Sequence, residues 1–208
     1  MNMVSTGWMM DPEVEAEGRM RWYASDWGMM FDTCALMHRA APLLMEHLAP
    51  MLRQYGTKVM VPWAVITELI RLSDDGRSAE RAESAQQGLE LLAGLMRQGL
   101  LMKIGDERED FGDNAILASL QRLCAGRRML LVTRDWNLAS DAMAMNEYHL
   151  ERMHPVEVRQ INRYGYFSPV QLRRVRPAGI PARPGMSQGE NPAALLQRMP
   201  VSSWSAAM

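Results

Sequence analysis

The chain has 208 residues, of which 48% are hydrophobic and 23% charged, a composition that is typical of a globular protein and excludes a collagen, a disulfide-stabilised mini-protein and a chain disordered throughout. Lysine and arginine number 23 against 24 aspartates and glutamates, so the net charge is −1. Any contact with nucleic acid or an anionic membrane must therefore depend on a local basic patch.

The two ends of the chain differ in charge. Residues 1–28 hold five acidic and two basic side chains and form an acidic N-terminal extension. Residues 171–208 hold five arginines against one glutamate and are rich in proline and glycine, which disfavour helices and sheets. We expect this tail to be mostly disordered, with a short helix over 193–199, and we place the folded domain at 29–170.

Short apolar runs alternate with helical periodicity between these ends. They predict strands at 29–31, 58–61, 100–104 and 128–133, and a weaker strand at 156–158. Helical spacing follows or lies between these strands at 36–52, 63–70, 82–96 and 113–124, and again after 133. Such alternation predicts an α/β protein with three layers (α/β/α) and a central parallel sheet of four to five strands.

Prolines and aromatic residues refine this outline. Pro42 and Pro50 are expected to break the segment 36–52 into two helices, because proline lacks the backbone N–H of a helix interior. Residues 166–169 are expected to form a turn that leads into a short terminal helix.

The cysteines and the hydropathy pattern indicate a cytoplasmic protein. Cys34 and Cys124 lie in apolar periodic segments and cannot form a disulfide framework, which favours a reducing compartment. No stretch approaches the roughly 20 apolar residues of a membrane span, and the first residues lack the basic start of a secretory signal. We therefore expect no membrane partner.

Four acidic residues stand at equivalent places in the predicted elements. Asp32 ends the first strand, Glu68 lies on the helix after the second, Asp113 opens a helix, and Asp135 follows the most strand-like run. Groups just past the carboxyl ends of parallel strands converge on one crevice. Four carboxylates there would repel one another unless a divalent cation neutralised them, and all-oxygen ligands suit Mg²⁺ or Mn²⁺.

Each acid also has a purely structural explanation. Asp32 and Asp113 have the sequence positions of helix N-caps, and Asp135 that of a turn residue. Glu68 lies among apolar residues of its helix, where a carboxylate needs a partner. Four such coincidences at matching positions favour a metal site over four separate structural roles.

Four short segments around these acids resemble the PIN-domain nuclease family, over about residues 29–145. The segments are FDTCAL at 31–36, VPWAVITEL at 61–69, DNAILA at 113–118 and TRDWNL at 133–138. The resemblance rests on their order and spacing, since each motif alone occurs by chance in many proteins. One departure is Asp141, which stands where some relatives have a basic residue and is a candidate fifth acid.

The resemblance implies metal-dependent hydrolysis of phosphodiester bonds, most often in single-stranded RNA. It implies Mg²⁺ or Mn²⁺ at Asp32, Glu68, Asp113 and Asp135, with Asp32 and Asp135 as direct ligands and the other two acting through water or on a second ion. The side chains expected to orient carboxylates or phosphate are Thr33, Thr133 and Asn137. Those expected to hold the substrate backbone are Arg134 and Arg71.

Several alternatives stay open from the sequence alone. One alternative is a toxin-type RNase with an inhibitory antitoxin-like protein as partner. Another is an inactive PIN-fold module that binds RNA or protein. Many relatives dimerise, so a homodimer is also considered. Trp63 and Trp136 beside the acids have two interpretations, a stacking platform for bases or a place in the core. An aspartate-phosphorylating phosphatase is disfavoured, because it needs an aspartate where Cys34 stands.

Overall fold

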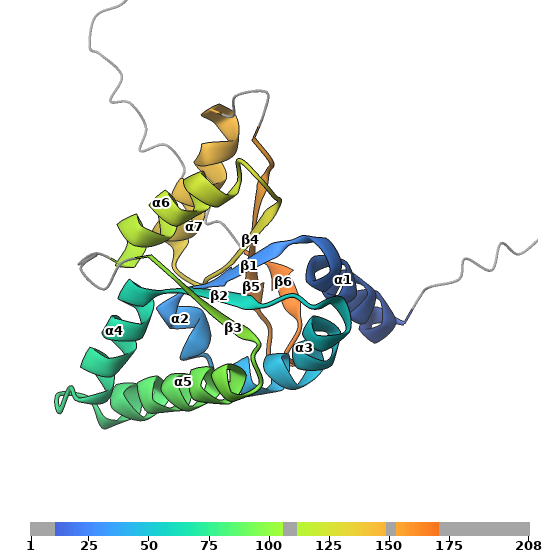
Figure 1. Cartoon of the computed structure of the whole chain (residues 1–208). Helices are drawn as coiled ribbons and strands as arrows, with labels where there is room; N and C mark the ends of the chain where they lie inside the picture. Colours follow the sequence, from blue (N-terminus) through green and yellow to red (C-terminus); the bar gives the residue numbers. More distant parts are fainter. Residues whose placement is uncertain (1–10, 106–111, 149–152, 171–208) are drawn as a thin grey trace, which may run out of the picture. The chain divides into compact units, whose positions relative to one another are not determined.

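The computed structural model describes residues 11–105, 112–148 and 153–170. These residues form one sheet with helices on both of its faces (Figure 1). The tail at 171–208, with the short helix expected at 193–199, lies outside the described residues. No helix in the described part of the chain combines the length and apolar character that a membrane crossing requires.

The sheet has six strands in the order β3-β2-β1-β4-β5-β6. The first five strands run parallel and β6 runs antiparallel to β5. In chain order they are β1 (Gly28–Phe31), β2 (Val59–Pro62), β3 (Leu101–Ile104), β4 (Met129–Val132), β5 (Val156–Ile161) and β6 (Phe167–Pro169). The α/β/α class is confirmed, and the sheet has one strand more than expected.

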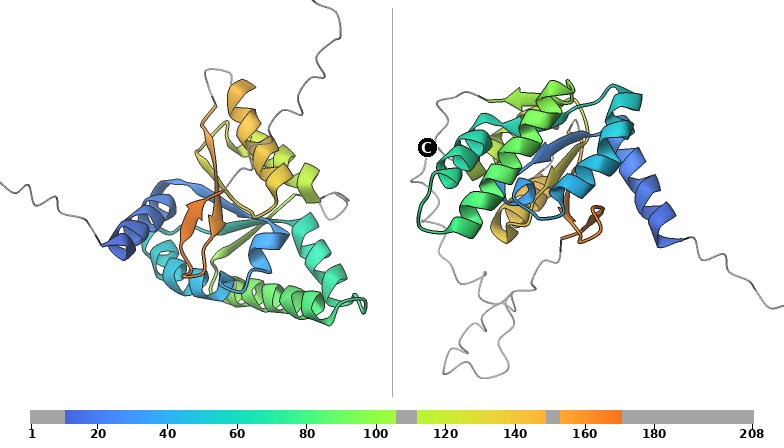
Figure 2. Two further views of the ribbon diagram at one scale, coloured as in Figure 1. Left: turned by 180° about the vertical axis from the view of Figure 1, so that it is seen from behind. Right: turned by 90° about the horizontal axis from the view of Figure 1, so that it is seen from below.

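The helices divide between the two faces according to the direction in which the chain crosses the sheet. They are α1 (Pro12–Asp26), α2 (Thr33–Leu36), α3 (Ala41–Tyr55), α4 (Trp63–Ser73), α5 (Ala79–Arg97), α6 (Gly112–Leu123) and α7 (Trp136–Ala144), followed by the 3₁₀ turn η1 (Met145–Tyr148). Figures 1 and 2 show α2 to α5 on one face and α6 and α7 on the other. Right-handed crossovers require this, because the chain moves outward from β1 to β3 and then returns to β4 and β5.

The three central strands are buried on both faces. Every residue of β1, β2 and β4 is buried, as expected for a parallel sheet that helices cover from both sides. Helices α3 and α6 close the two faces with fully buried side chains such as Leu44 and Ile116. The strand ends are thereby held by a two-sided core.

Two expectations about local structure were wrong. Pro42 does lie in the first turn of α3, but Pro50 lies inside that helix, which runs through it. Pro50 is exposed, so water can solvate the carbonyl that its missing N–H leaves free. Residues 167–169 form β6 where a turn was expected, because Gly165, with a φ of 71°, turns the chain back along β5. The short terminal helix expected after that turn lies outside the described residues.

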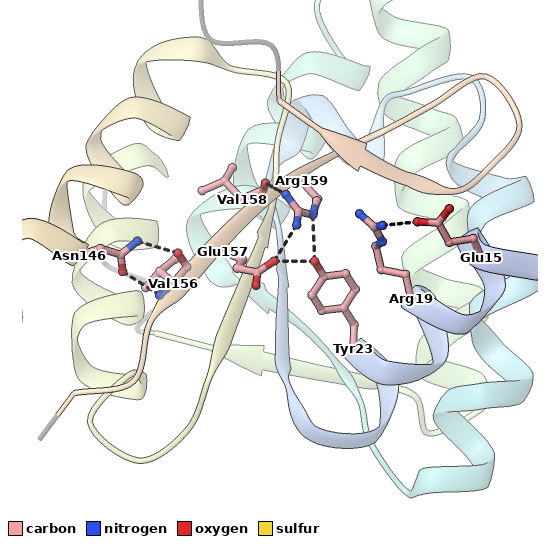
Figure 3. A network of polar contacts seen from close by, with 8 residues as sticks. All are labelled: Glu15, Arg19, Tyr23, Asn146, Val156, Glu157, Val158 and Arg159. Atoms are coloured by element: carbon pink, nitrogen blue, oxygen red, sulfur yellow. Dashed lines mark hydrogen bonds and ion pairs between the residues drawn. The ribbon is translucent and has the colours of Figure 1, made fainter. Parts of the chain in front are cut away.

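The acidic extension contains a helix that packs against the sheet. On α1, the side chains of Met20, Tyr23 and Ala24 are fully buried. The hydroxyl of Tyr23 donates to Glu157 Oε2 at 2.6 Å and accepts from Arg159 Nε at 2.9 Å, both on β5 (Figure 3). Burial, followed by the hydrogen bond to Glu157, raises the pKa of Tyr23 to about 12.

Candidate active site

The strand order locates a crevice between β1 and β4. The chain leaves β1 towards β2 on one side and enters β4 on the other, so the direction of winding reverses between these two strands. Ligands of open α/β sheets bind at such a point, beyond the carboxyl ends of the strands. Phe31 and Val132, the last residues of β1 and β4, pair directly, and Asp32 N donates to Val132 O at 3.1 Å. The first predicted acid therefore stands at this crevice.

Asp32 is buried and accepts hydrogen bonds on both carboxylate oxygens. It is the N-cap of α2, and its Oδ1 accepts from the backbone N–H of Thr33 at 2.6 Å. Its Oδ2 accepts from Thr133 Oγ1 and from Cys34 Sγ, each at 2.8 Å. Burial raises the pKa of Asp32, although the three hydrogen bonds act against this effect.

Asp135 is fixed beside Asp32 by the hydroxyl of Thr133. The backbone N–H of Asp135 donates to Thr133 Oγ1 at 2.9 Å, while the same hydroxyl donates to Asp32. Asp135 caps α7, since its Oδ1 accepts from the N–H groups of Asn137 and Leu138 at 2.7 and 3.0 Å. Its Oδ2 has no hydrogen bond from the described residues. The cap therefore holds the carboxylate in place and leaves one oxygen for a ligand.

Glu68 joins this group through Thr33. The half-buried carboxylate accepts a hydrogen bond from Thr33 Oγ1 at 2.7 Å, while Thr33 N binds Asp32. A Cβ placed on Gly112, the first residue of α6, would lie 3.5 Å from Glu68 Oε2. Glu68 thus has the partner that its apolar helix requires, and the start of α6 lies against it.

Asp113 lies in the first turn of α6, next to Gly112, and not before the helix as an N-cap would. Partial burial raises its pKa, and the negative charges of other acids raise it further. These acids are Asp32, Asp135, Glu68 and Asp141. The charges of the four other acids named from the sequence therefore all act on Asp113.

The comparison with known families agrees with this geometry. A sequence model of the PIN domain matches residues 29–147, more than half of the chain. The chain belongs to the PIN-domain family. PIN domains have a nuclease-type fold and typically act as metal-dependent ribonucleases. No curated protein sequence matches the chain.

The PIN match includes all five acids and leaves out α1, β5 and β6. Figure 3 shows Tyr23 of α1 joined to Glu157 and Arg159 of β5, so two of these outlying elements are bound to each other. Strands β5 and β6 complete the PIN sheet on the side of β4, since β5 pairs with β4 and β6 with β5.

The donor chemistry of this PIN site fits a hard divalent cation. As the side chains stand, no group of three or more His, Cys, Asp or Glu among the described residues has an arrangement that could hold a metal ion. The acids, with Thr33 and Thr133, nevertheless supply carboxylate and hydroxyl oxygens, which Mg²⁺ and Mn²⁺ prefer. Burial is the largest cause of the raised pKa of Asp113, and the charges of the other acids add to it; a cation would relieve this repulsion.

The remaining predicted side chains are placed around the PIN site in different ways. Arg134 is exposed, and its backbone N–H donates to Cys34 Sγ at 3.0 Å. Arg71 and Asn137 are exposed, and only the backbone of Asn137 contacts an acid. Trp63 contacts the ammonium group of Lys103, 4.9 Å from the ring centre.

Sequence reasoning missed the role of Cys34. Its thiol donates to Asp32, and burial raises the pKa of Cys34 to about 12, so the thiol keeps its proton. The signal was its place two residues after an N-cap, where the capping side chain reaches forward over the first turn of the helix.

Proposed function

We propose that this PIN domain is a divalent-metal-dependent endoribonuclease that hydrolyses phosphodiester bonds in single-stranded RNA. The observation that carries the proposal is the hydroxyl of Thr133, which binds both Asp32 and the backbone of Asp135 at the point where strand order reverses. A purely structural pair of caps does not need this shared contact. A site for a cation does, because its ligands must be held at a fixed separation.

The side chains of the site have different proposed roles in binding the cation. Asp32 and Asp135 are the proposed direct ligands, while Glu68 and Asp113 act through water or on a second ion. Thr33 orients Glu68, and Thr133 orients Asp32. When bound, Mg²⁺ or Mn²⁺ supplies a Lewis acid that activates water and neutralises the charge of the scissile phosphate.

The other contributions come from groups around these ligands. The protonated thiol of Cys34 stabilises the charge of Asp32 without competing for a hard cation. Asn137 and Asp141 lie on α7, and Arg134 is placed to contact the substrate backbone. An inhibitory antitoxin-like protein and a second copy of the chain remain predictions from the family resemblance, and a cytoplasmic location remains a prediction from the cysteines and the hydropathy pattern.

Cleavage of a panel of fluorescent single-stranded RNAs by the purified chain tests the proposal. Cutting is expected with Mn²⁺ or Mg²⁺, and is expected to cease with EDTA and in the variant Asp32→Asn. Asp26→Asn is the matched control, because exposed Asp26 stands before β1, at the opposite end of the strand from Asp32. Binding without cutting in every metal would instead support the inactive RNA-binding module.

A further inference from the structure

A polar cleft of about 560 Å³ adjoins the acidic site. Its walls come from three places in the chain: α2 with the residues after it, the start of α5, and the loop between β4 and α7. Three arginines line it, Arg39, Arg81 and Arg134, and we call it the arginine cleft. Its volume lies within the range of about 300–1,000 Å³ that is usual for small-ligand sites. The cleft therefore has room for a nucleotide-sized group.

The arginine cleft and the acidic site share a wall. Cys34 lines the cleft, and its thiol donates to Asp32 Oδ2 at 2.8 Å. Arg134 also lines the cleft, and its backbone N–H donates to the same sulfur at 3.0 Å. A molecule in the cleft therefore lies beside the carboxylates of the proposed active site.

The cleft has an excess of positive charge. Three arginines line it against one acidic residue, Glu80. None of the three forms an ion pair within the described part of the chain. By contrast, four other arginines each bind a carboxylate, namely Arg19, Arg77, Arg128 and Arg159. The cleft is thus a local basic patch of the kind that a chain with a net charge of −1 needs for contact with nucleic acid.

His38 also lines the cleft, where the charges of two of its arginines reach the ring. Burial lowers its pKa, and the charges of Arg134 and Arg39 lower it further. Its Nδ1 accepts from the backbone N–H of Ala40 at 3.2 Å, so a neutral ring carries its proton on Nε2. The cleft therefore also holds a neutral hydrogen-bond donor.

We infer that the arginine cleft binds the phosphate backbone of the RNA strand next to the scissile bond. This inference rests on the proposed function, and it adds the path that the substrate takes, from the acids past Cys34 and His38 to the start of α5. Single-stranded nucleic acid is usually held by a basic groove that follows its backbone. The adjoining acidic site repels phosphate by itself, so binding energy must come from cationic groups beside it. Arg39 and Arg81 supply them.

Equilibrium binding of a fluorescent single-stranded RNA to the full chain in EDTA tests the inference without cleavage. The variant Arg39→Gln/Arg81→Gln is compared with Arg53→Gln/Arg97→Gln, which removes equal charge from the other end of α5. Arg97 lies 16 residues after Arg81, about 24 Å along the helix axis, and Arg53 binds Gln98 beside it. Exposed arginines without ion pairs can be replaced with little effect on folding, which circular dichroism verifies.

The cleft variant is expected to bind RNA at least tenfold more weakly, with a slope of log K against log salt about 1.4 smaller, because two phosphate contacts are lost. The control variant is expected to bind within twofold of the unmodified chain. Unchanged binding in the cleft variant, or equal losses in both, would overturn the inference and point to a protein partner or to diffuse charge. Cleavage by the unmodified chain is scored separately, so a chain that binds RNA through the cleft but never cuts it would refute only the proposed function.

Discussion

Thr133 Oγ1 donates a hydrogen bond to Asp32 Oδ2 at 2.8 Å, and this contact joins the ends of β4 and β1. The same oxygen accepts from the N–H of Asp135. Thr133 is completely buried and Asp32 is nearly so, so this hydrogen bond is shielded from water. The separation of the two proposed ligands therefore depends on one hydroxyl group.

Replacing Thr133 with valine keeps the shape of the side chain and removes this hydroxyl. We expect the free energy of unfolding to fall by about 1–3 kcal/mol, because the buried carboxylate of Asp32 loses a hydrogen bond and the partly buried N–H of Asp135 loses its acceptor. RNA cleavage is expected to fall roughly 10- to 100-fold, as for other side chains that orient metal ligands. Urea unfolding and single-turnover cleavage measure the two effects. Thr133→Ser restores the hydroxyl and is the control; equal activity in both variants would exclude the positioning role.

Thr33→Val tests the link between Thr33 and Glu68. The variant loses the 2.7 Å hydrogen bond to Glu68 but keeps the backbone N–H that binds Asp32. We expect weaker Mn²⁺ binding, measured by calorimetric titration, with a smaller effect than that of Glu68→Gln. Affinity equal to that of the unmodified chain would mean that Glu68 needs no orientation by Thr33.

Asp32→Asn is expected to abolish cleavage and to raise thermal stability in metal-free buffer. Burial opposes the charge of Asp32, and a neutral amide removes this cost. Its oxygen can accept from Thr133, while the N–H of Thr33 loses its acceptor, and we expect the relieved burial cost to exceed this loss. In a chain of this size each kcal/mol gained raises Tm by roughly 2–4 °C. Scanning calorimetry in EDTA measures the change. A Tm below that of the control Asp26→Asn would show that the carboxylate stabilises the fold.

The contact of Tyr23 with β5 predicts a loss of stability at high pH. The pKa of Tyr23 is raised to about 12 in the folded chain against 10.0 for an ordinary tyrosine. The folded state therefore holds its proton between these values while the unfolded state releases it. The stabilising contribution is complete below pH 10 and is lost as pH rises towards 12.

Urea unfolding at pH 8, 10 and 11.5 measures this loss. Tyr23→Phe is expected to be less stable than the unmodified chain at pH 8 and to lose less stability on going to pH 11.5. Tyr55→Phe is the control, because Tyr55 is 37% exposed and lies on α3, outside the contact of Tyr23 with Glu157 and Arg159. Identical profiles for all three proteins would contradict the account of α1.

The layers of the fold and the place of the acids follow from sequence patterns that act locally. Alternation of apolar runs with helical spacing predicts the parallel sheet, and acids placed just after strands predict the crevice. The helix that runs through Pro50 and the strand β6 are not predicted by these patterns, for different reasons. The cost of an internal proline is set by its exposure, and β6 exists because β5 provides an edge with which it can pair.

The contacts that organise the site need the three-dimensional structure. Thr33 and Glu68 are 35 residues apart, and Thr133 and Asp32 are 101 apart. Nothing in a single sequence couples hydroxyl groups at such separations. Likewise, the arginine cleft is assembled from Arg39, Arg81 and Arg134, which appear in the sequence only as scattered basic residues.

The most direct test of the central claim is the rate of single-stranded RNA cleavage in Mn²⁺ by Asp32→Asn, Asp135→Asn and the double variant. Residues that act as one unit show strongly non-additive losses. We predict that each single change removes nearly all cleavage and that the double variant is no slower than either. Substantial cleavage by either single variant, or losses that multiply in the double variant, would contradict a site in which Asp32 and Asp135 together hold the cation.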